Sequence, residues 1–215
     1  MQKIKGCLFD LDGVLVDTAK YHYLAWKKLA NKLGFDFTQE DNEQLKGVSR
    51  MASLGILLGI GKINATEEQK LPWADDKNQI YVEYLKQLDS TALLPGTLSY
   101  LQALRKAGIK IALGSASKNS PMILQQLDIT KYFDAIIDGN SVTKAKPDPE
   151  VFVKGAQALG LTCEECAVFE DSLAGIKAAK AGGMLAVGIG TKENLMYADY
   201  YIKDLQEAFE KNMLF

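Results

Sequence analysis

Short apolar runs alternate with amphipathic stretches along most of the chain. An apolar run bounded by turn residues is typical of a buried strand, and apolar residues at helical spacing are typical of a helix that packs on one face. The alternation therefore predicts an α/β fold in which helices connect the strands of a sheet. The expected strands are Ile4–Asp10, Ile109–Leu113, Ala135–Ile137, Ala167–Phe169 and Leu185–Ile189.

The amphipathic stretches between these runs carry signals for both ends of a helix. Ser120 and Pro121 are typical of an N-cap followed by proline at the first helical position. Gly108, Gly160 and Gly182 follow the expected helices, where glycine commonly ends a helix. We expect a Rossmann-like, doubly wound parallel sheet. The expected helices of this core are Thr97–Ala107, Ser120–Leu127, Pro149–Leu159 and Ser172–Ala181.

Residues 18–88 differ from the rest, because their pattern is helical and contains no convincing strand. Apolar residues recur at helical spacing over Ala19–Leu33. Thr66–Gln69 forms a capping box, Pro72 is expected to kink or break the helix that follows, and a helical pattern resumes over Lys77–Leu88. We expect a small helical cap domain inserted after the first strand. Its expected bounds are residues 17–89, and those of the core domain are residues 1–16 and 90–215.

Composition narrows the class of protein. The chain has 215 residues, a net charge of −2 and 47% hydrophobic residues, which is typical of a globular protein. Because basic and acidic residues nearly balance, we expect neither nucleic acid nor a membrane as a partner. The longest apolar runs are too short to span a bilayer, and no signal peptide is expected before Asp10. We expect a cytoplasmic monomer that acts on small molecules.

The three cysteines are Cys7, Cys163 and Cys166, too few for a disulfide scaffold. Cys163 and Cys166 form a C-x-x-C pair, which leaves redox or metal chemistry open. However, no second pair accompanies them, and Thr162–Glu165 has the pattern of a capping box. The pattern favours a structural turn.

A first candidate site follows the first expected strand, at Phe9–Gly13 (FDLDG). Residues two apart on a strand face the same way, so Asp10 and Asp12 can share one site. Two carboxylates this close need a cation beside them or a proton on one of them. A bound Mg²⁺ or a protonated carboxyl would each suit phosphoryl transfer, with one Asp as nucleophile and the other as acid/base. A solvated acidic turn is the alternative.

A second acidic pair, Glu170 and Asp171, also follows an expected strand. Ligand sites of open parallel sheets lie outside the carboxyl ends of the strands, so both acidic pairs are expected at one edge. Two or three of these carboxylates, together with water and phosphate, could complete an octahedral Mg²⁺ site. Taken alone, this second pair could equally be a helix N-cap and a partner of the helix dipole.

Two further segments belong to the same expected edge. Leu113–Lys118 (LGSASK) ends a strand in small residues that let backbone N–H groups approach a phosphate, and Ser115 adds a hydroxyl. In Lys144–Pro149 (KAKPDP), Pro147 holds Lys146 out of helical geometry, so that the lysine can neutralise nucleophile and phosphate.

These motifs resemble, in their order, the four motifs of the haloacid-dehalogenase superfamily: D-L-D-G-V with a following Asp-Thr, then G-S-A-S, K-P-D-P and F-E-D-S. The resemblance covers essentially the whole chain, and the helical insert resembles the small cap of that family. It implies that Asp10 is the nucleophile and that Asp12 is the acid/base and a Mg²⁺ ligand through its carbonyl. It implies metal binding by Asp171 with help from Glu170. Ser115 and Lys146 are implied to hold the phosphoryl group.

The cap segments Tyr21–Trp26, Leu45–Arg50 and Lys77–Asn78, with Ser115–Asn119, are similar to the β-phosphoglucomutase branch of that superfamily. This implies exchange of a phosphoryl group between a phosphoaspartate and β-glucose 1-phosphate or glucose 6-phosphate, through the 1,6-bisphosphate. The implied substrate-binding residues are Thr18, His22, Trp26, Lys46, Gly47, Val48, Ser49, Arg50, Lys77, Ala116 and Lys118.

Within this set, Arg50 and Lys118 are implied to hold the non-transferring phosphate, and Thr18 and His22 to lie near Asp12 at a hinge. Trp26 also falls on the packing face of its expected helix. Two alternatives stay open: a sugar-phosphate or other small-molecule phosphatase on the same scaffold, and a catalytically silent binding protein. Loss of a catalytic residue would favour the silent protein, but Asp10, Asp12 and Lys146 are all present.

Overall fold

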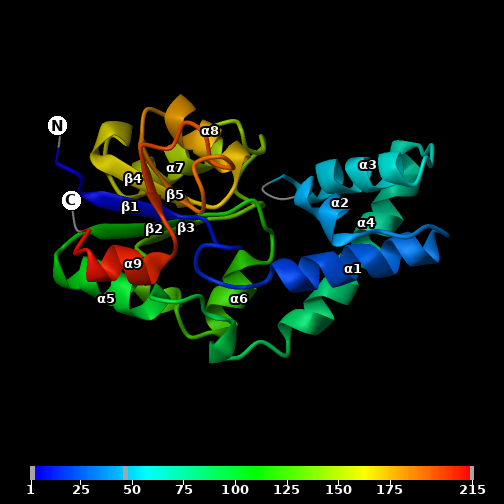
Figure 1. Ribbon diagram of the computed structural model, residues 1–215, viewed down its shortest axis with the longest axis horizontal. Coiled ribbons are helices and arrows are strands. Elements are labelled where there is room, and N and C mark those ends of the chain that lie inside the picture. Colours follow the sequence, from blue (N-terminus) through cyan, green and yellow to red (C-terminus); the bar gives the residue numbers. More distant parts are fainter. Residues whose placement is uncertain (1–2, 46–47, 214–215) are drawn as a thin grey trace.

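The structure is a computed structural model that describes residues 3–45 and 48–213. A six-stranded parallel sheet forms the centre of the larger lobe (Figure 1). The strands lie in the order β3-β2-β1-β4-β5-β6, which is the order of a doubly wound Rossmann fold and confirms the predicted fold class. The strands are β1 Gly6–Phe9, β2 Lys110–Gly114, β3 Ala135–Ile137, β4 Cys166–Glu170, β5 Leu185–Ile189 and β6 Tyr200–Ile202.

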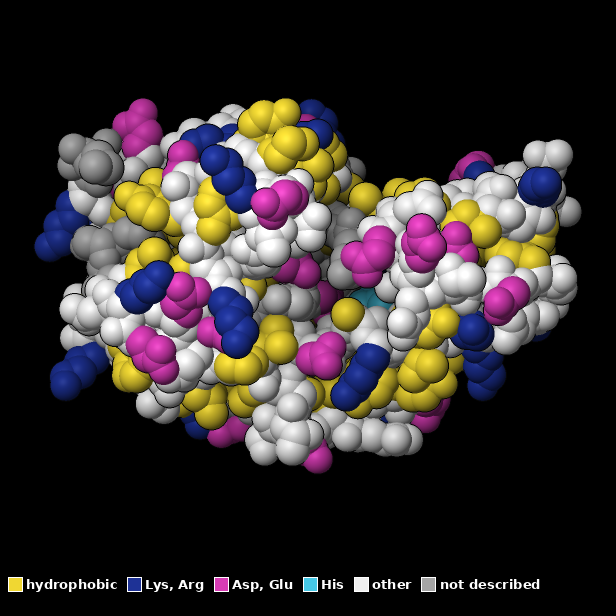
Figure 2. Space-filling view, in the orientation of Figure 1, with side chains coloured by type: hydrophobic (Ala, Val, Ile, Leu, Met, Phe, Trp, Pro, Cys, Tyr) yellow, Lys and Arg dark blue, Asp and Glu magenta, His cyan; other side chains and the backbone are white. Residues whose placement is uncertain are grey.

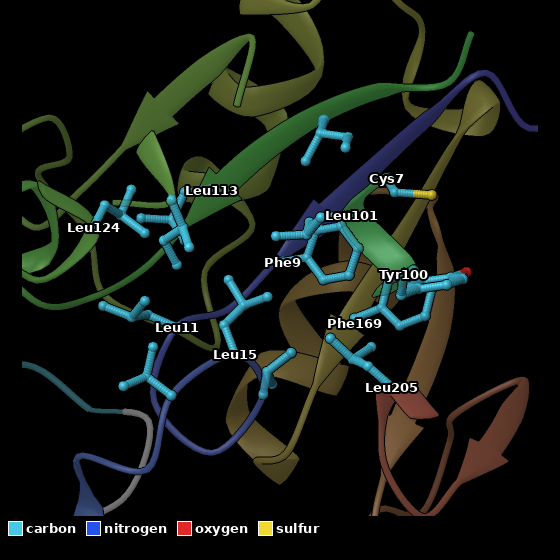
Figure 3. Packing of buried hydrophobic residues seen from close by; sticks show 14 of the residues in the cluster. Cys7, Phe9, Leu11, Leu15, Tyr100, Leu101, Leu113, Leu124, Phe169 and Leu205 are labelled. Atoms are coloured by element: carbon cyan, nitrogen blue, oxygen red, sulfur yellow. The ribbon is translucent and has the colours of Figure 1, made fainter. Parts of the chain in front are cut away.

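Helices cover both faces of this sheet, since alternate residues of the strands point to opposite sides. Phe9 of β1 stacks on Phe169 of β4 with ring centroids 4.7 Å apart, and Tyr100 packs edge-on against both (Figure 3). Leu8 belongs to a second buried cluster on the other face. The first face carries α5 Thr97–Lys106, α6 Ser120–Gln126 and α9 Leu205–Glu210, and the second carries α7 Glu150–Ala158 and α8 Leu173–Ala181.

A smaller, helical lobe stands at the side of the sheet (Figure 1). It has a hydrophobic core of its own, in which Trp26 and Leu29 meet Leu54 and Leu57. Its helices are α1 Ala19–Lys32, α2 Gln39–Glu43, α3 Arg50–Ile60 and α4 Glu67–Leu85. Short 3-10 turns elsewhere are Ser90–Ala92, Thr130–Tyr132 and Cys163–Glu165. No helix in the described parts of the chain is long and apolar enough to cross a membrane.

Of the kink or break expected at Pro72, the break is wrong. The capping box predicted at Thr66 is present, but the helix it opens runs on through Pro72 to Leu85. Pro72 lies in the second turn, where its missing N–H leaves only the carbonyl of Glu68 without its helical bond. Packing of α4 against α1 and α3 outweighs that loss.

Two C-terminal elements, β6 and α9, are not among the predicted ones. Both are short, and the chain before β6 has mixed polarity, so no periodicity marks them. The C-x-x-C segment forms the expected turn: the side chain of Glu165 accepts from the backbone N–H of Thr162 at 3.0 Å. Cys163 and Cys166 are free thiols, and Cys166 is buried.

Candidate active site

The carboxyl ends of β1, β2 and β4 meet below the helical lobe, and a cavity of about 540 Å³ lies between them and α1, α3 and α4. Figure 2 shows a hollow between the two lobes, and His22 is among the residues that line the cavity. Most of the predicted site residues line this cavity. They are Asp10, Asp12, His22, Trp26, Val48, Ser49, Arg50, Lys77, Ser115, Ala116, Lys118, Lys146 and Asp171.

The other four predicted site residues are not among those that line the cavity. Thr18 and Glu170 lie behind it, where they contact residues that do line it. Lys46 and Gly47 lie outside the described residues.

A buried lysine joins the two acidic motifs. The Nζ atom of Lys146 lies 2.6 Å from Oδ1 of Asp10 and 2.6 Å from Oε1 of Glu170. Burial disfavours the charged form of Lys146, but the two carboxylates outweigh burial and raise its pKa. Lys146 therefore remains an ammonium group that supports Asp10 from below.

Both aspartates of the first motif have raised pKa values. Burial raises the pKa of Asp10 to about 6, against the opposing effect of Lys146. Burial and the nearby charge of Asp10 raise the pKa of Asp12 to about 7. Both carboxyls thus hold a proton more readily than an ordinary aspartate does, which suits a group that acts as an acid and a base.

Residues at the start of α1 hold Asp12. The hydroxyl of Thr18 donates to Oδ1 of Asp12, and Nε2 of His22 lies 3.8 Å from Oδ2. The other ring nitrogen of His22, Nδ1, is 2.9 Å from Nζ of Lys77. The first motif is thereby connected to α4 of the helical lobe.

Lys77 is almost fully buried, with 3% of its surface exposed. Its ammonium lies 4.6 Å from the ring centroids of both Trp26 and Tyr81. Burial, together with the charge of Arg50, lowers the pKa of Lys77 to about 7. Trp26 thus has both predicted roles, since it packs in the core of the helical lobe and also lines the cavity.

Small residues after β2 form a compact turn at the cavity. The backbone N–H of Ser117 donates to Oγ of Ser115 at 3.1 Å, and Ser115 is buried. Gly139 lies so close to this turn that a Cβ atom there would clash with the carbonyl oxygen of Ala116.

The cavity-lining residues that sequence reasoning missed include Asn78, Asn119 and Tyr81. Oδ1 of Asn78 accepts from Arg50 at 2.8 Å and from Nδ2 of Asn119 at 2.9 Å. The position of both asparagines next to predicted site lysines was the available signal. Nothing in the sequence distinguishes Tyr81, which is fully buried, from an ordinary core tyrosine.

The predicted metal ligands Glu170 and Asp171 have different surroundings. Oε2 of Glu170 accepts from the backbone N–H and the hydroxyl of Ser172, and Oε1 faces Lys146, so this carboxylate is already satisfied. Asp171 instead lies against the backbone at Gly13, where a Cβ atom would clash with its carboxylate. No cluster of three or more His, Cys, Asp or Glu side chains suited to a metal occurs among the described residues. Of the predicted metal ligands, Asp10, Asp12 and Asp171 line the cavity, whereas Glu170 lies behind it.

A sequence profile of the haloacid dehalogenase-like hydrolase family matches residues 4–183. The chain belongs to this family. Phosphomutases of the family use Mg²⁺.

Its relatives include both mutases and phosphatases. The β-phosphoglucomutase of Bacillus subtilis is 40% identical over 206 residues, which cover 95% of this chain and 91% of the relative. The phosphorylated carbohydrates phosphatase of Thermotoga maritima is 31% identical over 184 residues, covering 84% and 82%. The crystal structure of the β-phosphoglucomutase from Clostridium difficile matches with a TM-score of 0.91 at 39% identity, covering 99% of this chain and 100% of that one.

Proposed function

We propose that the protein is a β-phosphoglucomutase, which interconverts β-D-glucose 1-phosphate and glucose 6-phosphate. The observation that carries the proposal is a single cavity with phosphate-binding chemistry on both sides. Asp10 and Lys146 line it at the sheet edge, and Arg50 and Lys118 contribute further cations. A volume of about 540 Å³ is in the range of small-molecule sites and suits a hexose bisphosphate.

In this proposal, Asp10 and Asp12 carry the chemistry. A carboxylate oxygen of Asp10 attacks a phosphorus atom of β-glucose 1,6-bisphosphate, the bond from phosphorus to the sugar oxygen breaks, and that oxygen takes a proton from Asp12. A glucose monophosphate then presents its free hydroxyl in the opposite orientation. That hydroxyl gives its proton to Asp12 and attacks the phosphoaspartate, which restores Asp10 and regenerates the bisphosphate.

Lys146 and Ser115 would stabilise the transferring group. The ammonium of Lys146 lies within hydrogen-bond distance of Asp10, so it can balance negative charge that develops on the phosphoryl oxygens. Ser115, buried at the end of β2, can donate its hydroxyl to the same group. Glu170 holds Lys146 in place from the side away from the cavity.

Mg²⁺ would be held by Asp10, Asp171 and the carbonyl of Asp12. These are the oxygen donors that this hard cation prefers, and the contact of Asp171 with Gly13 brings its carboxylate to the backbone beside Asp12. The ion would neutralise charge on the phosphoryl group and on Asp10. Glu170 would contribute only through Lys146 and Ser172.

The helical lobe would act as a cap, with the proposed bounds of residues 17–89. Its closure would exclude water from the phosphoaspartate. His22 and Lys77 connect the cap to Asp12 at the hinge. The proposed sugar contacts are Trp26, Lys46, Gly47, Val48, Ser49, Lys77 and Ala116, and the proposed ligands of the non-transferring phosphate are Arg50 and Lys118.

A sugar-phosphate phosphatase is the second candidate, favoured by the 31% identity to the Thermotoga maritima phosphatase. The two activities share the phosphoaspartate and differ in whether water or a sugar hydroxyl attacks it.

The test supplies purified enzyme with Mg²⁺, β-glucose 1-phosphate and a trace of β-glucose 1,6-bisphosphate, and measures glucose 6-phosphate and free phosphate together. We expect fast formation of glucose 6-phosphate with little free phosphate. Free phosphate alone would assign the protein to the phosphatases. The Asp10→Ala variant serves as the control and should show neither product; turnover by this variant would contradict the role of Asp10 in both candidates.

A further inference from the structure

A three-residue hydrogen-bond bridge spans the cavity between the helical lobe and the sheet. Asn78 of α4 accepts with Oδ1 from the guanidinium of Arg50, the first residue of α3, at 2.8 Å. The same oxygen accepts from Nδ2 of Asn119, the N-cap residue of α6, at 2.9 Å. One amide oxygen thus holds a group of each lobe.

Hydrogen-bond chemistry fixes the orientation of the side-chain amides of Asn78 and Asn119. A guanidinium group has only donors, so the atom of Asn78 that faces Arg50 has to be its oxygen. Asn119 must then present its amide nitrogen to that oxygen. The bridge therefore sets both the distance and the direction of the two donor groups.

The bridge also preserves the positive charge of Arg50. Asp75 lies one turn earlier on α4 and also lines the cavity, yet within the described chain no Arg50–Asp75 ion pair forms, and the guanidinium bonds to the neutral amide of Asn78. A neutral acceptor uses a single N–H and leaves the net charge and the remaining donors available for an anion.

We infer that Asn78 is a positioning residue for the non-transferring phosphate: it orients Arg50 from the cap and Asn119 from the core around one phosphate while leaving Arg50 charged. This inference rests on the proposed function, because it assumes a substrate with a second phosphate. Asn78 does not touch the reacting atoms, so it should affect binding of the second phosphate and not the chemistry at Asp10.

Two variants separate the role of Asn78 as a hydrogen-bond acceptor from the effect of its lack of charge. Asn78→Ala removes the acceptor and retains the charge of Arg50, whereas Asn78→Asp retains an acceptor of the same shape and neutralises that charge. We expect KM for β-glucose 1,6-bisphosphate to rise about tenfold in the alanine variant, since hydrogen bonds to charged groups contribute at this level. The aspartate variant should show a still larger rise, because its charge also repels the phosphate.

Acetyl phosphate, a phosphoryl donor without a second phosphate, is the comparison substrate. Its kcat/KM should stay within about twofold of wild type in both variants, since its one phosphate contacts only the Asp10 side of the site. Gln79→Ala removes an exposed amide from the adjacent position of the same helix, and should leave both donors unaffected.

Equal losses on both donors, unchanged KM for the bisphosphate, or an aspartate variant no worse than the alanine variant would each overturn the inference. Failure of the proposed function can be told apart from failure of this inference. If the wild type releases phosphate without isomerising the sugar, it is a phosphatase, and the rates of phosphate release from the bisphosphate and from acetyl phosphate still test the role of Asn78.

Discussion

Lys146 carries the charge balance of the site at the scale of single residues. It is 4% exposed and lies between two buried carboxylates. Removal of one member of such a buried group leaves the others uncompensated, which is far more costly than the net contribution of the pair. We therefore expect Lys146 to contribute to stability as well as to the proposed binding of the phosphoryl group.

We expect Lys146→Met to abolish turnover and to lower the free energy of unfolding by about 3–5 kcal/mol, because Asp10 and Glu170 lose their shared cation. Lys144→Met is the matched control from the same loop, since the Lys144 side chain is 70% exposed. Urea unfolding and the mutase assay measure both effects. Equal stability of the two variants would contradict the assigned charge balance.

Gly13 makes a specific demand on the backbone. Its φ is +82°, and a Cβ atom there would clash with the carboxylate of Asp171. We expect Gly13→Ala to displace Asp171. Loss of a group that orients a metal ligand typically lowers metal affinity by about 10–100-fold, so calorimetric titration should show Mg²⁺ binding weakened to this extent. The control is Gly34→Ala, because Gly34 has a similar positive φ of +93° but no atom lies within 4 Å of where its Cβ would be. It should lose stability alone; weakened Mg²⁺ binding in this control would mean that backbone strain, and not the clash, is responsible.

The buried Lys77 should make stability depend on pH. In the unfolded chain Lys77 has its ordinary pKa of 10.5, whereas burial lowers the folded value to about 7. Between these values the unfolded state binds one more proton, so stability should rise with pH by about 1.4 kcal/mol per pH unit. Urea unfolding across this range should show this slope as a difference between wild type and Lys77→Met. The same slope in both proteins would show that Lys77 remains charged when buried.

At the scale of elements, α4 shows how packing overrides a local signal. Pro72 interrupts the hydrogen bonds of a 19-residue helix but does not end it, since α4 packs along α1. The part of α4 that follows Pro72 carries both Lys77 and Asn78 to the cavity.

We expect Pro72→Ala to raise the free energy of unfolding by about 1–3 kcal/mol, because alanine restores the hydrogen bond to Glu68 and has higher helix propensity. Pro72 is exposed, so no packing is lost. Mutase activity should not change. Denaturant unfolding measures the effect, and a loss of stability would indicate that proline acts by restricting the unfolded chain.

The strand ends were the most predictable elements of the site. Each apolar run is followed directly by its polar residues, and the carboxyl ends of parallel strands meet at one edge. Asp10, Ser115 and Asp171 could therefore be assigned before the structure was known. β6 and α9 could not, because neither is long enough to show a period.

At the scale of the whole molecule, three hydrophobic clusters hold the fold together: one on each face of the sheet and one in the helical lobe. The proposed Mg²⁺ donors lie at the edge between the lobes. We therefore expect stability and metal binding to be separable.

We expect EDTA to stop turnover and to leave the melting temperature nearly unchanged, because burial of apolar side chains in the three clusters supplies the main driving force for folding. Added Mg²⁺ should restore activity. Circular dichroism melting and the mutase assay on one sample measure both quantities. A large fall in melting temperature would show that the donors near Asp10 repel one another enough to destabilise the fold.

The sequence by itself determined the fold class, the helical insert and the positions of the candidate catalytic residues at the strand ends. These follow from periodicity and from the geometry of parallel strands, which are local properties or general rules of the fold. Only the tertiary structure decided that Glu170 supports Lys146, that Lys77 faces His22, and that Asn78 joins Arg50 to Asn119. These contacts connect residues 24 to 55 positions apart, and their geometry depends on how the helical lobe packs beside the sheet and on which side-chain directions that packing leaves free.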